Sequence, residues 1–441
     1  MMLQKDFPSV TKYMGSKTEV LDLIERGINY FDNDHEWICD LFSGSATLSA
    51  ALRNKANVIS NDIQEYSEVF ANTYLDNYFW DNYPDVKEIT NEALERYHKF
   101  LNYYSDYDES FSYDHDFTLE EFNSLEEKER DLIKKNDWNE FDNYYLFTKD
   151  YSGTYWSFKQ CVMIDSYRYV IDKYKDYPEL FNLLLSCLMY AMAYNSQSTG
   201  HYAQYRIPET DSSKEDILIY RRKHLSNLFE RKYEDLKEYL QGENHYKFIT
   251  MAETDDDCLS KMPERSLVYA DPPYSPVHYS RFYHVLETLV KYDYPEVRYK
   301  GRYRTDRYQS DFCIRTHVIT AFNEMFKRIK EKNSDMILSY TTSDANTIKF
   351  DELITTCCDA FNPDMLNDGE KNDLIEKCYQ FIDYKNENQI LDVLSADESH
   401  KDLQYSISLI KKPYNHSRMG RTKKKTVPVV ETVIVAKYLN K

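Results

Sequence analysis

Ser266-Leu-Val-Tyr-Ala-Asp-Pro-Pro-Tyr274 is a short apolar run that ends in a proline-rich tetrapeptide. The run has the length and the β-branched and aromatic content of a buried strand. Two consecutive prolines fix φ and remove two backbone donors, so the strand must end there. Ligands of open α/β sheets bind beyond the carboxyl ends of the strands, so Asp271 to Tyr274 are predicted to border a crevice.

Other apolar runs bounded by turns have the same strand-like character. They are Trp37–Phe42, Asn57–Ser60, Lys247–Met251, Met336–Tyr340, Tyr405–Ile410 and Val429–Lys437. Helical patterns at Ser45–Lys55, Ser67–Tyr78 and Val318–Lys332 lie between several of them. Strands that alternate with helices predict a doubly wound, mainly parallel α/β sheet, here of seven strands. The last two runs lack a helical crossover, so we expect them to pair antiparallel.

The chain divides into a sheet domain and two insertions. We predict the following segments: 1–78, first part of the sheet domain; 79–245, a large and mostly helical insertion; 246–350, second part of the sheet domain; 351–400, an acidic helical insertion; and 401–441, the final strand hairpin. Residues 81–150 hold 20 acidic and 8 basic side chains, a net charge of −12. This acidic lobe is expected to be a solvated surface, with a protein partner or DNA mimicry as alternatives. No Pro-rich or Gly/Ser-rich linker separates the parts, so the insertions should pack on the sheet domain.

The composition is that of an acidic globular protein. Of 441 residues, 42% are hydrophobic and 15% aromatic, enough for a large core, and the net charge is −20. A chain this acidic does not attract nucleic acid through its average field, so binding would need local basic patches. Three segments supply them: Arg206–Lys232, Arg298–Tyr308 and Lys411–Lys425. The second segment interleaves cations with aromatics around Gly301, and the third contains Gly420. Three such runs in an acidic chain favour nucleic-acid contact over solvated loops.

The cysteines and the N-terminal residues indicate the compartment. Eight Cys occur without a CxxC pair, which is typical of reduced thiols in a cytosol. The first ten residues have no apolar region and no run of about 18 apolar residues occurs. We therefore expect a soluble, cytoplasmic protein with no membrane partner. The histidines have no metal-ligand spacing, so no metal is expected.

The residues around Asp271 predict a particular ligand chemistry. Asp271 and the Pro272 carbonyl form an acceptor pair, and Tyr274 adds a ring two residues on. This combination suits a flat heterocycle with an amino group. A second signal is the turn Phe42-Ser-Gly-Ser-Ala46 between a strand and a helix, where small residues let a ligand approach backbone N–H groups. Asp62 follows a strand at the spacing of a ribose-binding acid.

The chain resembles the DNA adenine-N6 methyltransferases of the Dam-like alpha group. Their D-P-P-Y motif is Asp271–Tyr274, their D-x-F-x-G-x-G motif is Asp40–Ala46, and their K/R-Y-x-G-S/G-K motif is Lys12–Lys17. The motifs follow the alpha order, with the large insertion where this group keeps its target-recognition region. After D-P-P-Y, Ser275–His284 is similar to the methylases of type II restriction-modification systems, as is His416–Gly420.

The resemblance implies a Rossmann-like, class I methyltransferase sheet that binds S-adenosylmethionine. Asp40 would face its ammonium group, Tyr13 and Lys17 its carboxylate, and Asp62 its ribose. The full set of implied cofactor-binding residues is Tyr13, Lys17, Asp40, Phe42, Ser43, Gly44, Asp62, Ile63 and Asp255. Ile63 would pack on the adenine and Asp255 bind its amino group, although Asp256 and Asp257 are equally placed alternatives. Ala46 replaces the second motif glycine, and its methyl is expected where the backbone approaches the cofactor.

The resemblance also implies a reaction on a flipped-out adenine of duplex DNA. The catalytic residues would be Asp271, Pro272, Pro273 and Tyr274: the first two accept the amino hydrogens, and Tyr274 stacks on the base. Several side chains are predicted to bind DNA. They are Asn195, Gly200, His201, Tyr202, Arg221, Arg222, Tyr279, Arg281, Arg302, Arg304, His416, Arg418 and Lys423.

Alternatives to this interpretation remain open. The acceptor could instead be cytosine N4, adenine in RNA, or a protein amide. D-P-P-Y accepts the amine of either base, and only the alpha order and the family resemblance favour adenine in duplex DNA. The chain could also be a non-catalytic DNA-recognition subunit that keeps the fold. A cognate restriction endonuclease or another defence-system subunit is a possible partner in either case.

Overall fold

The structure is a computed structural model that describes residues 1–12, 17–31, 35–198, 200–273, 275–343, 346–383, 389–396, 400–416 and 427–439, with backbone alone at 413–416 and 427–429. One large sheet forms its centre, with strand order β3-β2-β1-β4-β7-β10-β9-β8. Its strands are β1 (Trp37–Asp40), β2 (Asn57–Asn61), β3 (Phe248–Met251), β4 (Leu267–Ala270), β7 (Asp335–Thr341), β8 (Ile390–Leu394), β9 (Tyr405–His416) and β10 (Val427–Tyr438).

The topology agrees with the sequence prediction. Strands β3, β2, β1, β4 and β7 are parallel, whereas β10 is antiparallel to both β7 and β9. All seven predicted strands are present, and the last two pair antiparallel as expected. The carboxyl ends of β1, β2 and β4 therefore meet at one edge of the sheet.

The segment 351–400 differs from its prediction. It holds α15 (Phe350–Phe361) and α16 (Asp368–Ile382), but then forms β8, which extends the sheet beyond β9. The two helices agree with the predicted acidic helical insertion, but the strand was not predicted. Only the last residue of β8 is buried, because the strand lies at the sheet edge, so the segment carries no strong apolar signal.

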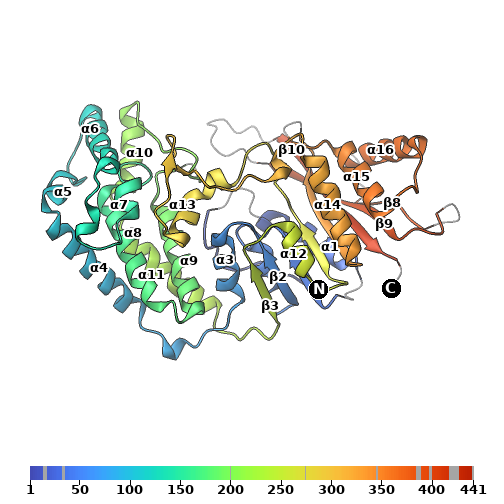
Figure 1. The fold of residues 1–441 in the computed structure, drawn as a ribbon, viewed down its shortest axis with the longest axis horizontal. Coiled ribbons are helices and arrows are strands. Elements are labelled where there is room, and N and C mark those ends of the chain that lie inside the picture. Colours follow the sequence, from blue (N-terminus) through green and yellow to red (C-terminus); the bar gives the residue numbers. More distant parts are fainter. Residues whose placement is uncertain are drawn as a thin grey trace.

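Helices cover both faces of the sheet (Figure 1). On one face, α1 (Leu21–Asn29) and α2 (Thr47–Leu52) share an apolar cluster with the strands. On the other face lie α12 (Asp255–Lys261), α14 (Val318–Glu331) and α15. Here α14 corresponds to the helix predicted at Val318–Lys332, which precedes β7.

A helical lobe lies at one end of the molecule, left in Figure 1. Its helices are α4 (Val86–Tyr103), α5 (Ser105–Ser110), α6 (Leu119–Arg130), α7 (Leu146–Tyr151), α8 (Phe158–Ile171), α9 (Pro178–Asn195), α10 (Asp211–Arg221) and α11 (Leu225–Tyr239). α9 is buried on nearly all sides, as its continuous apolar sequence predicts. It joins α3 (Glu65–Leu75) and α13 (Ser280–Lys291) in one apolar cluster, so the lobe packs firmly on the sheet domain.

The remaining regular elements are short. Strands β5 (Val297–Arg298) and β6 (Tyr303–Arg304) form a separate hairpin. The 3₁₀ turns are η1 (Lys17–Val20), η2 (Trp80–Asn82), η3 (Asp131–Lys134), η4 (Trp138–Glu140), η5 (Asp172–Tyr174) and η6 (Asp311–Cys313).

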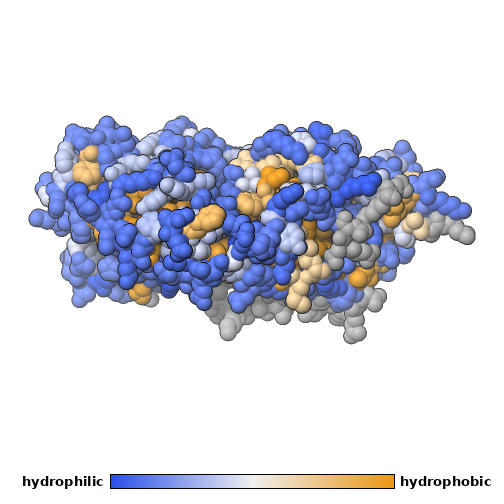
Figure 2. Space-filling model, turned by 90° about the horizontal axis from the view of Figure 1, so that it is seen from below, coloured by the Kyte–Doolittle hydropathy of each residue, from blue (hydrophilic) through white to orange (hydrophobic). Residues whose placement is uncertain are grey.

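The visible surface is mainly hydrophilic, with only scattered apolar patches on the face in Figure 2. All eight cysteines are buried and unpaired by disulfides, in line with the expectation of reduced thiols. Among the described residues, no helix has the length and apolar character to cross a bilayer.

Candidate active site

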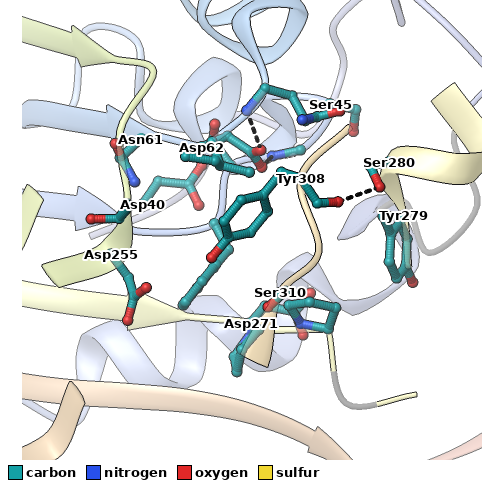
Figure 3. A pocket seen from close by; sticks show the side chains of 18 of the residues that line it. Asp40, Ser45, Asn61, Asp62, Asp255, Asp271, Tyr279, Ser280, Tyr308 and Ser310 are labelled. Atoms are coloured by element: carbon teal, nitrogen blue, oxygen red, sulfur yellow. Dashed lines mark hydrogen bonds between the residues drawn. The ribbon is translucent and has the colours of Figure 1, made fainter. Parts of the chain in front are cut away.

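A pocket opens at the carboxyl ends of β1, β2 and β4, where the sequence predicted a crevice (Figure 3). Every predicted cofactor residue that the structure describes lines it. They are Lys17, Asp40, Phe42, Ser43, Gly44, Asp62, Ile63 and Asp255. Asp271, Pro272 and Pro273 line the same pocket, so the two groups of predicted residues come together.

The turn after β1 supplies backbone N–H groups to the pocket. Gly44 has a φ of +53°, a left-handed conformation that glycine adopts without steric cost. Ala46 also has a positive φ, +54°, directly before α2 begins. Its side chain is fully buried in the apolar cluster shared with α3 and the helical lobe, and it does not line the pocket. The expectation that its methyl meets the cofactor was therefore wrong.

Asp62 fixes this turn from the neighbouring strand. Its two carboxylate oxygens accept hydrogen bonds from the backbone N–H groups of Gly44 and Gln64, each at 3.0 Å. Burial raises the pKa of Asp62 to about 6, although these backbone hydrogen bonds act in the opposite direction.

Asp40 lies at the end of β1, only 2% exposed. It accepts a hydrogen bond from the Ser49 hydroxyl at 3.0 Å. Burial raises its pKa to about 7, and the negative charges of Asp62 and Asp271 act in the same direction. A buried carboxylate with no cation beside it in the described structure is well suited to receive a cationic ligand group.

Asn61 holds the ends of three strands together. Its Nδ2 donates to the backbone oxygens of Leu41 and Glu253, both at 3.1 Å. Its Oδ1 accepts from the Glu253 N–H at 3.3 Å. Sequence reasoning missed Asn61, although its place beside Asp62 at the end of a strand was a usable signal.

The geometry distinguishes the three aspartates after β3. Only Asp255 lines the pocket, and burial raises its pKa to about 6. Asp256 accepts from Arg328 at 2.5 Å, and Asp257 bonds to the Thr254 hydroxyl at 2.7 Å as part of the α12 cap. Asp255 is thus the one available to a ligand.

Asp271 follows β4 and forms an ion pair with Lys17 through Oδ2. Its Oδ1 is buried and has no hydrogen-bond partner among the described residues. Burial raises the pKa of this carboxyl, and the charge of Lys17 opposes that rise. Tyr13 and Tyr274, predicted for the cofactor and the target base, lie outside the described residues.

A third wall comes from the segment after the D-P-P-Y motif. His278, Tyr279, Ser280, Tyr308 and Ser310 all line the pocket. The Ser280 hydroxyl donates to the Tyr308 carbonyl at 2.6 Å, and the Tyr308 ring projects into the pocket beside Asp255 (Figure 3). Of these five, only Tyr279 was predicted as a site residue.

Comparison with known proteins agrees with this geometry. The family model of the D12 class N6 adenine-specific DNA methyltransferases matches residues 13–345. The chain belongs to this family.

Curated relatives are bacterial methylases of low identity. The type II methyltransferase M.FokI of Planomicrobium okeanokoites is 25% identical over 341 residues, which cover 75% of this chain and 44% of the relative. The modification methylase LlaI of Lactococcus lactis subsp. lactis is 22% identical, covering 78% of this chain and 48% of the relative. The modification methylase StsI of Streptococcus sanguinis is 21% identical over 94% of this chain and 55% of the relative. The chain thus spans about half the length of these relatives.

Several DNA contacts predicted for this D12 class chain are internal. Arg221 is fully buried and donates to Glu126 Oε1 through Nε and Nη2, at 2.8 and 2.6 Å. Arg304 donates to both Asp293 and Asp306. Because each guanidinium is already paired with carboxylates, we no longer expect these two side chains to contact DNA.

Three further predicted contacts are also buried. Arg302 donates to the backbone oxygens of Asp150 and Arg130. Asn195 is 0% exposed at the end of α9, and Tyr202 is 2% exposed in an aromatic cluster. Their burial contradicts the prediction of direct DNA contact and indicates that these three side chains have a structural role.

The other predicted contacts lie nearer the surface. Gly200 has a φ of +96°, and the His201 ring packs on Phe282 with centroids 4.7 Å apart. Arg281 donates to the Tyr303 hydroxyl at 3.0 Å, beside the pocket residue Tyr279. These positions stay predictions.

The remaining predicted contacts are placed only in part. Arg222 is exposed and donates to the backbone oxygens of Tyr113 and His115. The side chain of His416 is not described, and Arg418 and Lys423 lie outside the described residues. No group of three or more metal-ligating side chains occurs in the part of the chain that the structure describes.

Proposed function

We propose that this chain transfers a methyl group from S-adenosylmethionine to the exocyclic amino group of a flipped-out adenine at specific sites in duplex DNA. The observation that carries the proposal is the Oδ1 atom of Asp271. It is buried without a partner among the described residues, at the end of β4, in the same pocket as the cofactor-type carboxylates. An acceptor left unpaired in an interior site is suited to an N–H donor from a ligand.

The pocket fits S-adenosylmethionine. The carboxylates of Asp40, Asp62 and Asp255 line it, and the ammonium group, the ribose hydroxyls and the adenine amino group of this cofactor are all donors. A cationic group would offset the unfavourable burial that raises the pKa of Asp40. Gly44 keeps the adjoining backbone free of a side chain. When bound, the cofactor supplies a methyl group already activated by its sulfonium.

The acceptor side uses the D-P-P-Y motif. The target base must leave the stack before its amino group can enter the pocket, at a cost of a few kcal/mol. Asp271 and the Pro272 carbonyl would then accept the two amino hydrogens, which directs the nitrogen lone pair towards the methyl group. The charge of Lys17 favours the ionised form of the Asp271 carboxyl against the effect of burial, and Tyr274 would stack on the base. Positioning and electrostatics would supply most of the acceleration.

The names of the relatives suggest the biological setting. M.FokI is a type II methyltransferase, and LlaI and StsI are modification methylases. We propose by analogy that this chain is the modification arm of a cytoplasmic restriction-modification or phage-defence system, with a cognate endonuclease as partner. In this proposal 79–245 forms the target-recognition region, 1–78 and 246–350 the methyltransferase domain, and 401–441 its terminal hairpin, with 351–400 added at the sheet edge.

The test is single-molecule sequencing with modification calling. DNA from cells that express the chain is compared with DNA from cells that express Asp271→Ala. We expect N6-methyladenine at one short motif with the native chain and none with the variant. Soluble protein that binds S-adenosylmethionine but leaves DNA unmodified would overturn the proposal in favour of an RNA or protein acceptor or a non-catalytic subunit.

A further inference from the structure

Cations and tyrosines form a patch at the carboxyl end of α9, which we call the α9 patch: Lys12, Tyr190, Tyr194, Lys223 and Arg231. The Lys12 ammonium lies 4.2 Å from the centroid of the Tyr194 ring, and Lys223 donates to the Tyr194 carbonyl at 3.3 Å. Arg231 donates to the Tyr190 hydroxyl at 2.8 Å, and the two tyrosine rings stack with centroids 4.4 Å apart. Segments distant in sequence thus bring three positive charges together.

The charges of this patch are not neutralised within the described structure. None of Lys12, Lys223 and Arg231 forms an ion pair with a carboxylate of a described residue, and Lys223 and Arg231 are exposed. The charge of Lys223 adds to burial in lowering the pKa of Lys12, so these two lysines lie close enough to repel one another. In a chain of net charge −20, such a cluster is a local exception.

The patch contrasts with the arginines that the sequence favoured. Arg221 and Arg304 are held by carboxylates in the interior, whereas Lys223 and Arg231 contact tyrosines and keep their charge available. Repulsion among unpaired cations is relieved when an anion binds, and a phosphate backbone releases counterions as it does so.

The patch lies within reach of the pocket. Lys12 is five residues from Lys17, a chain length that spans at most about 18 Å, and Lys17 contacts Asp271. Phosphates follow one another about every 3.4 Å along each strand of a duplex, so this span corresponds to about five base pairs.

We propose that Lys223 and Arg231 of the α9 patch bind the phosphate backbone of duplex DNA a few base pairs from the target base. This inference rests on the proposed function, since it assigns a surface to the same substrate. An acidic protein segment is the other occupant that the charge would admit. The short distance between the patch and the pocket is expected if both contact the same DNA, whereas an acidic protein segment would not need that distance to be short. We therefore favour DNA.

The test measures DNA affinity against salt concentration. Full-length chain with S-adenosylhomocysteine is titrated into a 30-base-pair duplex, for the native protein and for Lys223→Ala/Arg231→Ala. We expect the slope of log K against log salt to become shallower by about 1.8, because each phosphate contact contributes about 0.9. Affinity in low salt should fall at least about tenfold, with S-adenosylhomocysteine affinity unchanged. Lys223→Ala alone should give half of the slope change.

The matched control is Lys99→Ala/Lys173→Ala, which removes two exposed lysines that pair with Glu95 and Glu92. Its slope should equal that of the native protein. If the patch variant has the same salt slope as the native protein, and the native protein binds the duplex, this inference is overturned and the proposed function still stands. If the slope changes as expected but the native chain does not methylate DNA, this inference stands and the proposed function is overturned. If the native chain binds an acidic peptide and the variant does not, while both bind DNA equally, the patch binds a protein partner and this inference is overturned.

Discussion

Lys17 and Asp271 form an ion pair in the pocket, and it occupies only one of the two carboxylate oxygens of Asp271. The other oxygen is left for a donor that the described structure does not supply. Lys17 comes from the N-terminal motif and Asp271 from the end of β4. The pair therefore joins the motif Lys12–Lys17 and the motif Asp271–Tyr274 through one contact. We predict that Lys17 acts on the side of the methyl acceptor as well as near the cofactor.

We predict that Lys17→Met lowers methylation at neutral pH about 10- to 100-fold, the loss of one charge-assisted hydrogen bond. Burial raises the pKa of Asp271 and Lys17 opposes this, so removing Lys17 raises that pKa further. Because the reaction needs the ionised carboxylate, the rate of the variant should fall at a higher pH as the solution is acidified. Single-turnover rates from pH 5 to pH 9 measure this shift.

Lys17→Arg is the control, since it retains the positive charge and should restore most of the native pH profile. A profile of Lys17→Met that coincides with the native one, with only the cofactor affinity reduced, would show that Lys17 acts on the cofactor alone.

A second prediction concerns Asp40→Asn. The pKa of Asp40 in the folded chain is about 7 against an ordinary 3.8, so the folded state holds this proton more tightly than the unfolded state. Its ionisation therefore removes stability as the pH rises through this window, by up to about 4 kcal/mol above pH 7. Asp40→Asn should be more stable than the native ligand-free chain at pH 8, by about 1–4 kcal/mol, and should bind S-adenosylmethionine more weakly.

Urea unfolding at pH 5 and pH 8 measures the effect, which should be smaller at pH 5. Glu127→Gln, an exposed acid on α6 of the helical lobe, serves as control and should change stability little at either pH. Equal stability of the native chain and Asp40→Asn at pH 8 would contradict the prediction.

The sequence was sufficient to predict seven of the eight strands of the large sheet and the carboxylates of the site. Seven strands are apolar runs of ordinary length, and the acids at their ends come together because parallel strands end at one edge. Strand β8 was missed because its only fully buried residue is the last one, Leu394. Apolar runs identify strands that are buried on both faces, and they fail to identify a strand such as β8 that is only partly buried.

Where a residue's position depends on tertiary contacts, the sequence did not predict that position. Tyr308 reaches the pocket because its carbonyl accepts from Ser280, 28 residues away, and no local pattern encodes that contact. Likewise a charge run predicted Arg221 as exposed, but its partner Glu126 is 95 residues away. A run of cations indicates where charge lies in the sequence and leaves its pairing undetermined.

We predict that Tyr308→Ala weakens S-adenosylmethionine binding about tenfold. The ring projects into the pocket near Asp255, and an aromatic contact is worth about 0.5–1.5 kcal/mol beyond its buried area. Tyr308→Phe should remain within about threefold of the native affinity, because the ring carries the contact. Titration calorimetry measures both. Tyr299→Ala, on the same segment but 80% exposed, should bind as the native chain does, and an equal loss there would indicate a general effect on the segment.

Ala46→Gly should leave the cofactor affinity within about twofold of the native value. The Ala46 methyl lies in the apolar cluster outside the pocket, so its removal opens no space for the cofactor. A φ of +54° is unfavourable for alanine by about 1–2 kcal/mol, while the buried methyl contributes about 0.8 kcal/mol. The free energy of unfolding should therefore change by no more than about 1 kcal/mol. Calorimetric measurement of cofactor affinity and urea unfolding test this. A tenfold tighter cofactor complex of Ala46→Gly would show that the Ala46 methyl does contact the cofactor.

Arg221→Met should destabilise the fold by about 3–5 kcal/mol, because it leaves Glu126 buried without its guanidinium partner. Glu129, also fully buried and with a pKa raised by burial to about 8, would lose the nearby positive charge too. Arg222→Ala removes the neighbouring, exposed arginine and should cost far less stability. If Arg221 instead contacted DNA, Arg221→Met would retain native unfolding and weaken DNA binding with a shallower salt slope. Urea unfolding and salt-dependent DNA titration of the two variants therefore separate a structural arginine from a DNA contact.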